Sequence, residues 1–338
     1  MTGGRECAST GCAIILSLAL AACGDGSGPG TPDQLHLAVT VSVDLTSFPQ
    51  SGEFDLDLVP SDASGKTYIA DNWTIAATLG APTTISATIL GNSVEPADTS
   101  PVSAAVLIDD SGSMRSSDPD RVRSAAAQLF WNTVLPAREG NQVAILDFGR
   151  GDSSATPGFD RTRLLADFTS DAAVLTAAVA NIQAVPGGAT PLYQSGLEVI
   201  QWMDTVTAPT SQRLLVVITD GAPSDPTVAQ QLYPAARAAG IRVFAVGLGA
   251  AAQDDPPTDA TLRLLELASR TGGVYGAADS AEQLRPLLMT LAQSASPARL
   301  LVHLQVTPVP DPGTVLSGDA SVSGIRGTAS ATWTFVAP

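Results

Sequence analysis

The sequence is poor in the residues on which most enzymes and nucleic-acid-binding proteins depend. Its three cysteines all lie within the first 23 residues, so the rest of the chain can form neither a disulfide nor a thiolate metal site. Only two histidines occur, His36 and His303, which leaves few groups able to activate a nucleophile near neutral pH. The 17 basic residues form no run and face 33 acidic ones, so a net charge of −16 disfavours a nucleic-acid partner.

The sequence has ample apolar residues. They make up 44% of 338 residues, which is typical of a folded protein long enough for two domains of ordinary size. Because no disulfide is available beyond residue 23, we expect these domains to be stabilised by core packing.

The N-terminus has the features of an export signal. Residues 12–22 are apolar but too few to span a bilayer, so we expect residues 1–22 to be a signal peptide that is removed. The sequence from Leu20 to Cys23 resembles the lipobox of bacterial lipoproteins, which implies lipidation of Cys23. The alternative is a plain signal peptide with an incidental cysteine.

The residues after the lipobox fit an exported, anchored protein. The segment 23–33 is rich in glycine, proline and serine and is predicted to be a flexible tether. In the lipoprotein pattern, Gly24 after the cysteine implies the outer membrane in an organism that has one. We therefore expect a protein of the cell envelope, held by a lipid anchor.

The middle of the chain alternates between apolar runs and helix-like segments. The runs at 103–109, 142–148, 213–219 and 241–248 predict buried parallel strands, with weaker candidates at 163–168 and 273–277. Helical patterns separate them, and two further helices are predicted at 170–183 and 280–295. This order predicts an α/β fold with a doubly wound, mostly parallel sheet over residues 101–296.

The segments on either side of that domain have strand character. Residues 34–100 alternate polar and apolar side chains between turns, and 297–338 return to the same pattern but are too short for a domain alone. We therefore expect both segments to form one β-sandwich-like domain, interrupted by the α/β domain. The alternative is two separate β elements that flank the central domain.

The sharpest motif is VLIDDSGSM, where an apolar strand ends in Asp109 and is followed by Ser111 and Ser113. Ligands of open α/β sheets bind beyond the carboxyl ends of the strands, where these side chains would lie. Two further segments carry oxygen-bearing side chains at comparable places. Thr190 lies in GGATPLY before a predicted helix, and Asp220 ends the strand VVITDG.

Together the three segments resemble the metal-site motifs of von Willebrand factor type A domains. The resemblance implies that Ser111 and Ser113 ligate a divalent metal and that Thr190 does so directly or through water. It also implies that Asp109 and Asp220 contact the ion directly or through water. Oxygen donors of this kind suit Mg²⁺, our first expectation, and also Mn²⁺ or Ca²⁺. In the family an acidic residue of a partner protein completes the site. This chain departs from the pattern in one place, because Ala189 separates Thr190 from the glycine pair.

Other interpretations of these residues are open at this stage. The two aspartates can be ordinary strand-end acids, with the serines capping the following helix. We expect Asp110, Asp118 and Asp120 to be solvated acids of a loop and a helix cap. We expect His36 and His303 to be exposed strand residues, with a paired metal site as the alternative.

Three classes of function follow from the motif. The leading hypothesis is an envelope-anchored, adhesion-type module that binds a protein ligand through the metal and acts on no small-molecule substrate. The second is a scaffold or accessory subunit of an envelope complex. The third is a hydrolase that uses the metal as a Lewis acid, against which stands the lack of a histidine, lysine or cysteine in the predicted site, so we expect no enzyme.

Overall fold

The structure is a computed structural model, and it describes most of the chain beyond the N-terminal 34 residues. The described ranges are 35–43, 47–61, 73–96, 100–149, 156–180, 182, 187–221, 223–253, 257–277, 298–324 and 327–338. The predicted signal peptide, the tether, Cys23 and the predicted helix at 280–295 lie outside these residues. Within the described part, no helix has the length and hydrophobicity needed to cross a membrane.

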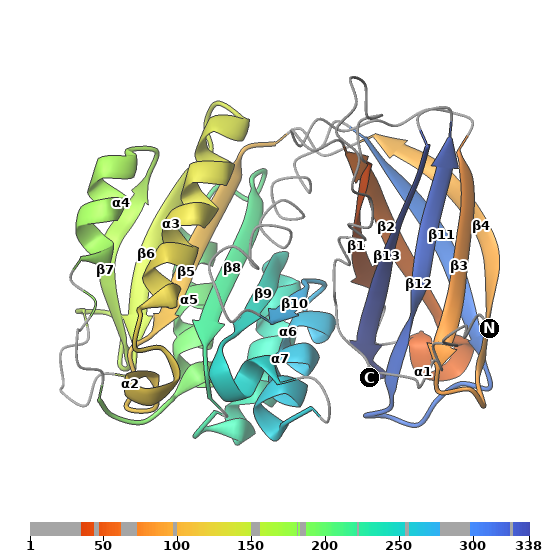
Figure 1. The fold of residues 1–338 in the computed structure, drawn as a ribbon. Coiled ribbons are helices and arrows are strands. Elements are labelled where there is room, and N and C mark those ends of the chain that lie inside the picture. The colour runs from red at the N-terminus through yellow and green to blue at the C-terminus, as the bar shows by residue number, and fades with distance from the viewer. Residues whose placement is uncertain are drawn as a thin grey trace, which may run out of the picture.

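The central domain is an α/β fold built on a six-stranded sheet (Figure 1). In chain order the strands are β5 (Val102–Asp109), β6 (Gln142–Phe148), β7 (Thr162–Thr169), β8 (Gln212–Thr219), β9 (Ile241–Gly247) and β10 (Tyr275–Ala277). Their spatial order is β10-β9-β8-β5-β6-β7, and only the edge strand β7 is antiparallel to its neighbour. The predicted doubly wound, mostly parallel sheet is confirmed.

Helices cover both faces of this sheet, which explains why every residue of β5 is buried. One face packs under α3 (Val122–Val134) and α4 (Ala172–Val179), and the other under α5 (Leu192–Val206), α6 (Ala229–Ala238) and α7 (Asp259–Arg270). A short helix, α2 (Met114–Ser117), follows β5. The helix expected at 170–183 is shorter, because it ends at Val179.

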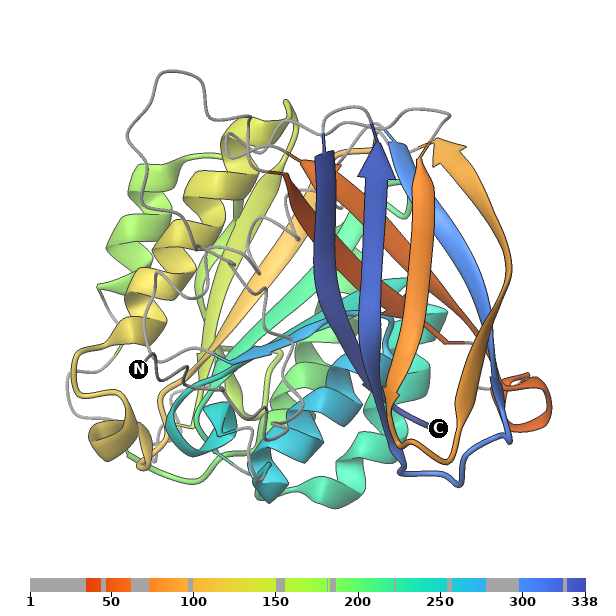
Figure 2. The same cartoon turned by 45° about the vertical axis from the view of Figure 1, so that its right-hand side comes forward.

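The remaining strands form two antiparallel sheets packed face to face (Figures 1 and 2). They are β1 (His36–Ser42), β2 (Glu53–Ser61), β3 (Thr74–Ala81), β4 (Ser86–Pro96), β11 (Ala298–Thr307), β12 (Val315–Gly324) and β13 (Gly327–Val336), with a short helix α1 (Phe48–Ser51) between β1 and β2. One sheet has the order β1-β2-β11-β4 and the other β13-β12-β3, so each sheet combines strands from both sides of the central domain in the sequence.

The sandwich has its own core, in which Phe54 packs against Trp333 and Phe335 at centroid distances of 5.3 and 5.0 Å. The two histidines do not meet in it. β2 lies between β1 and β11, and in the register of β2 His36 faces Ser61 while His303 faces Asp55. The alternative prediction that His36 and His303 form a paired metal site is therefore wrong.

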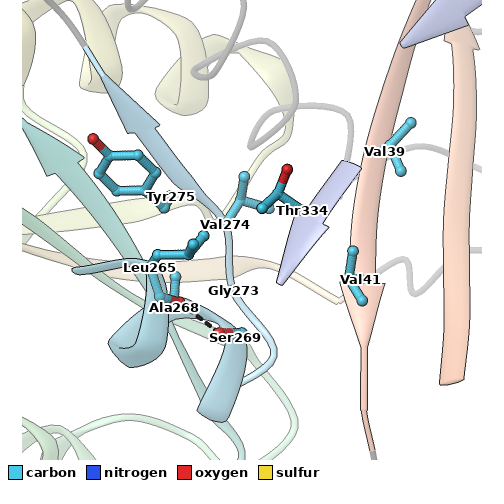
Figure 3. Close-up of a pocket in the computed structure, with 9 residues that line it drawn as sticks. All are labelled: Val39, Val41, Leu265, Ala268, Ser269, Gly273, Val274, Tyr275 and Thr334. Atoms are coloured by element: carbon cyan, nitrogen blue, oxygen red, sulfur yellow. Dashed lines mark hydrogen bonds between the residues drawn. The ribbon is translucent and has the colours of Figure 1, made fainter. Parts of the chain in front are cut away.

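The sandwich packs against the α7 and β10 side of the central domain. Figure 3 shows the residues at this contact, where Thr334 of β13 lies beside Val274 in the segment that leads into β10, and Val39 and Val41 of β1 line the same cavity from the sandwich. The cavity left between them has a volume of about 10 Å³. Val336 at the end of β13 belongs to the core cluster on that side of the central sheet. The two parts of the molecule are thus joined by apolar packing as well as by the chain.

Candidate metal centre

The candidate site lies at the carboxyl ends of β5 and β8, the two neighbouring strands from which the chain winds in opposite directions. Asp109 is the last residue of β5, and Asp220 directly follows β8. Such a switch point is where open α/β sheets bind ligands, because the loops that follow the two strands diverge there. The fold therefore brings two of the predicted residues together from segments about a hundred positions apart.

The three hydroxyl residues join them in one connected set of hydrogen bonds. Ser113 Oγ donates to Asp220 Oδ1 at 2.8 Å, and Ser111 Oγ lies 3.2 Å from Ser113 Oγ. Thr190 Oγ1 donates to Ser111 Oγ at 3.1 Å. Asp109 contacts the same loop, since its Oδ1 accepts the backbone N–H of Ser111 at 2.8 Å. The structure thus brings together all five residues of the predicted site.

These spacings fit a divalent ion with oxygen ligands. Mg²⁺ holds its oxygens at about 2.0–2.1 Å in an octahedron, which places neighbouring ligand atoms about 3 Å apart. The three oxygen pairs above lie between 2.8 and 3.2 Å apart. Ser111, Ser113 and Thr190 would therefore hold the ion with little rearrangement, and Asp109 and Asp220 would supply its charge balance. The ion would add a hard Lewis-acid centre that attracts a carboxylate.

The alternative in which the serines only cap a helix does not describe Ser113. It is the N-cap residue of α2, yet its side chain makes no capping hydrogen bond and turns to Asp220 instead. A second serine of the same turn, Ser117, also donates to Asp220, through Oδ2. Sequence reasoning missed Ser117, although its spacing of four residues from Ser113 places both on one side of a helical turn.

Burial shapes the electrostatics of the site. Asp109 and Ser111 have no exposed surface, and Asp220 is 3% exposed, whereas Ser113 is exposed. Burial raises the pKa of the Asp109 carboxyl to about 6, against the opposing effect of hydrogen bonds from Ser111 and Thr219. A cation beside Asp109 would favour its ionised form. The exposed side at Ser113 is the side from which a ligand can approach.

The loop that carries Thr190 is tied to the loop after β5 through the backbone. Gly112 N–H donates to Gly188 O at 3.0 Å, and Gly187 N–H donates to Asp110 O at 3.2 Å. These bonds place Thr190 within reach of Ser111 despite the inserted Ala189. The departure from the family pattern therefore leaves this hydroxyl in the site.

Asp225 fixes the segment after Asp220 to the helix that follows Thr190. Its carboxylate accepts the backbone N–H groups of Tyr193 and Gln194 in the first turn of α5, at 3.3 and 2.6 Å. Ser224 N–H also donates to Thr190 O at 2.9 Å. Sequence reasoning did not identify Asp225, because a capping residue distant in sequence leaves no local pattern.

The expectation that the acids after Asp109 are solvated is wrong for two of the three. Asp110 and Asp118 are 0% and 3% exposed, and Asp120 alone is exposed. Arg123, itself 1% exposed, lies between the buried pair, 2.7 Å from Asp118 Oδ2 and 3.4 Å from Asp110 Oδ1. The physical reason is that the arginine of α3 compensates two carboxylates that would otherwise be costly to bury.

The candidate site contains no imidazole, amine or thiol. Among the described residues, the side-chain hydrogen bonds of the five predicted residues run to one another, to Ser117 and to Thr219. No group of three histidine, cysteine, aspartate or glutamate side chains suited to a metal occurs in the described part of the chain, at this site or elsewhere. The candidate centre therefore consists mainly of neutral hydroxyls with two carboxylates.

Comparison with known proteins identifies the family of the central domain. A sequence model of the von Willebrand factor type A domain matches residues 105–288, which is more than half of the chain. No curated protein sequence matches the chain.

Several solved structures are similar. Manganese-loaded TRAP protein of Plasmodium vivax has 16% identity and a TM-score of 0.44, over 72% of this chain and 96% of its own. A von Willebrand factor type A protein of Catenulispora acidiphila has 14% identity and a TM-score of 0.43, over 93% and 75%. Proximal thread matrix protein 1 of the mussel byssus, with a zinc-occupied MIDAS motif, has 15% identity and a TM-score of 0.40, over 63% and 49%.

Proposed function

We propose a metal-dependent protein-binding function for this chain, which belongs to the von Willebrand factor type A domain family. In this proposal Ser111, Ser113 and Thr190 hold a divalent ion, with Mg²⁺ expected first, and an acidic side chain of a partner protein completes its coordination. The observation that carries the proposal is the chain of hydrogen bonds from Asp220 through Ser113 and Ser111 to Thr190, in which neighbouring oxygens lie at ligand spacing. Asp109 joins this set through the backbone N–H of Ser111.

The charge of the site supports a carboxylate ligand. Its two carboxylates balance the two charges of the ion, and the three hydroxyls are neutral, so the ion stays electrophilic toward another hard oxygen. A partner that offers an aspartate or glutamate at the exposed Ser113 side would meet this need. The partner would also have to approach a chain of net charge −16, so we expect its remaining contact surface to be neutral or basic.

We further propose that the site binds and does not catalyse. Its only titratable side chains are Asp109 and Asp220, and both are engaged as hydrogen-bond acceptors. A hydrolase would need a general base free to take a proton from the attacking water, and the site residues provide none.

The proposed location is the cell envelope, with Cys23 as the lipid-bearing residue and residues 23–33 as the tether. The support is the apolar run at 12–22 followed by the lipobox-like sequence. Metabolic labelling with a clickable fatty acid tests this: labelling of the parent and none of Cys23→Ala is expected, and equal labelling would exclude the anchor.

The binding proposal is tested by retention of envelope proteins on the immobilised protein. We expect at least one protein to be retained in Mg²⁺, released by EDTA, and not retained by Asp109→Asn, because that change removes charge from the ion's surroundings without changing side-chain size. The retained partner should lose binding when the aspartate or glutamate that reaches the ion is replaced with asparagine or glutamine.

Retention that is unaffected by EDTA and by Asp109→Asn would overturn the proposal. Such a partner would instead support the second hypothesis, a scaffold or accessory subunit of an envelope complex.

A further inference from the structure

A groove lies between α3 and α4, on the face of the sheet that these two helices cover side by side (Figure 1). Its volume is about 340 Å³, which lies within the size range of small-molecule sites, roughly 300–1,000 Å³. The α3 residues that line it follow one face of the helix, at helical spacing. The lining residues are Arg121, Ser124, Ala125, Gln128, Trp131, Thr176, Val179 and Ala180.

Three of these residues carry a buried polar atom without a hydrogen-bond partner. The atoms are Arg121 Nε, Ser124 Oγ and Trp131 Nε1. Trp131 is 1% exposed, so water does not compensate its indole N–H. Buried polar atoms in folded proteins nearly always have partners, because leaving one unpaired is costly. Three such atoms lie on residues of this one groove.

The backbone of Arg121 adds to this picture. Its φ of 56° is the only positive value at a non-glycine residue in the described part of the chain. An arginine is disfavoured in that conformation, and such strain concentrates at binding and switch sites. One end of its guanidinium is fixed, because Nη2 donates to Ile182 O at 2.9 Å. The group is thereby held at the groove with Nε unused.

The chemistry of the unpaired atoms selects the ligand. Arginine Nε and indole Nε1 can only donate, and a serine hydroxyl can donate as well. Arg121 is the only charged residue of the lining, whereas Ala125, Val179 and Ala180 offer a small apolar wall. We propose that this groove is a second ligand site, which takes a small organic carboxylate through Arg121, Ser124 and Trp131.

Binding in this site involves a rearrangement of side chains. The three donor atoms are buried. Gln128 is exposed and lines the groove, and its long side chain can change rotamer to admit the carboxylate. The carboxylate then accepts charge-assisted hydrogen bonds from donors that otherwise have neither a protein partner nor water.

The groove is separate from the metal centre. None of the five proposed metal-site residues lines it, and its ligand is bound by donors and not by an ion. Carboxylates can reach both places, so the test is made on the Asp109→Asn variant, freed of metal with EDTA and then dialysed to remove the EDTA, which is itself a carboxylate. If no ligand binds in the groove, that result does not bear on the metal centre. Failure of the metal-centre experiments likewise does not bear on the groove.

The test follows the indole N–H signals of the purified protein by two-dimensional ¹H–¹⁵N NMR during titration with benzoate. The chain has four tryptophans, and Trp131→Phe identifies the signal of Trp131. We expect benzoate at millimolar concentrations to shift this signal saturably, and the neutral isostere benzamide to leave it unchanged.

Two variants examine the groove directly. Arg121→Gln should weaken benzoate at least about tenfold, since it removes a charged donor. Ala125→Leu should abolish the shift by filling the groove. The matched controls Arg237→Gln, at an exposed position of α6, and Ala173→Leu, at an exposed position of α4 outside the groove, should bind as the parent does.

The absence of a saturable shift with benzoate would overturn the proposal. An equal shift with benzamide, or a shift that survives both Arg121→Gln and Ala125→Leu, would overturn it as well.

Discussion

Replacement of Arg123 with methionine is expected to lower the free energy of unfolding by about 3–5 kcal/mol, the range found when one partner of a buried ion pair is removed. Arg123 is 1% exposed and compensates Asp118 and Asp110, which are 3% and 0% exposed. Methionine keeps much of the volume but leaves both carboxylates buried without their cation. Urea denaturation followed by tryptophan fluorescence measures the change.

The control for this prediction is Arg237→Met, at an exposed position on α6, which should change stability by less than about 0.5 kcal/mol. A triple variant that adds Asp110→Asn and Asp118→Asn should recover much of the loss, because no buried charge then lacks a partner. An Arg123→Met variant as stable as the control would mean that the ion pairs of Arg123 with Asp110 and Asp118 do not stabilise the segment between β5 and α3.

The same variant should also weaken metal binding. Asp110 lies between Asp109 and Ser111, and Asp118 accepts the backbone N–H groups of Val122 and Arg123 at the start of α3. Loss of the arginine therefore releases both ends of the segment that contains Ser111 and Ser113. Local order of the hydroxyls is what allows them to act together as ligands.

Gly149→Ala is expected to weaken Mg²⁺ binding at least about tenfold, which corresponds to about 1.4 kcal/mol. Gly149 follows β6 with a φ of 91°, and a Cβ there would lie 2.8 Å from Ser111 N and 2.9 Å from Ser111 Cβ. Neither atom can move away without moving the loop, so the added methyl group displaces a proposed ligand. Calorimetric titration of both proteins with Mg²⁺ measures the loss.

Gly158→Ala provides a matched control for that experiment. Gly158 has a similar φ of 99°, but a Cβ there would meet nothing within 4 Å. Both variants should lose about 1–2 kcal/mol of stability from backbone strain, and only Gly149→Ala should lose metal affinity. Equal metal affinity of the two variants would contradict the role assigned to the contact with Ser111.

The sequence was sufficient to predict the central sheet and the residues at its switch point. Strands such as β5 are buried on both faces, so they are uninterrupted apolar runs, and the polar residues that end them are conspicuous. Asp109 ends β5 and Asp220 directly follows β8, and these two strands are neighbours at the switch point of the sheet. The apolar run with its polar end marks the site locally, and the strand order brings the two strand ends together.

The supporting contacts could not be predicted in the same way. Gly149 is significant only because β6 lies beside β5, and nothing near it in sequence shows that its missing side chain makes room for Ser111. Asp110 and Asp118 were expected in solvent because aspartates in loops usually are. Their burial depends on Arg123, whose role appears only when α3 is folded onto the loop.

The measurement that tests the metal centre most directly is calorimetric titration of the protein with Mg²⁺, Mn²⁺ and Ca²⁺, beside a variant that carries Asp109→Ala and Ser111→Ala. Asp311→Ala, an exposed change in the sandwich, is the control. We predict saturable binding of at least one ion to the parent and the control, and none to the double variant. Absence of binding to the parent, or unchanged binding to the double variant, would contradict a metal centre at these residues.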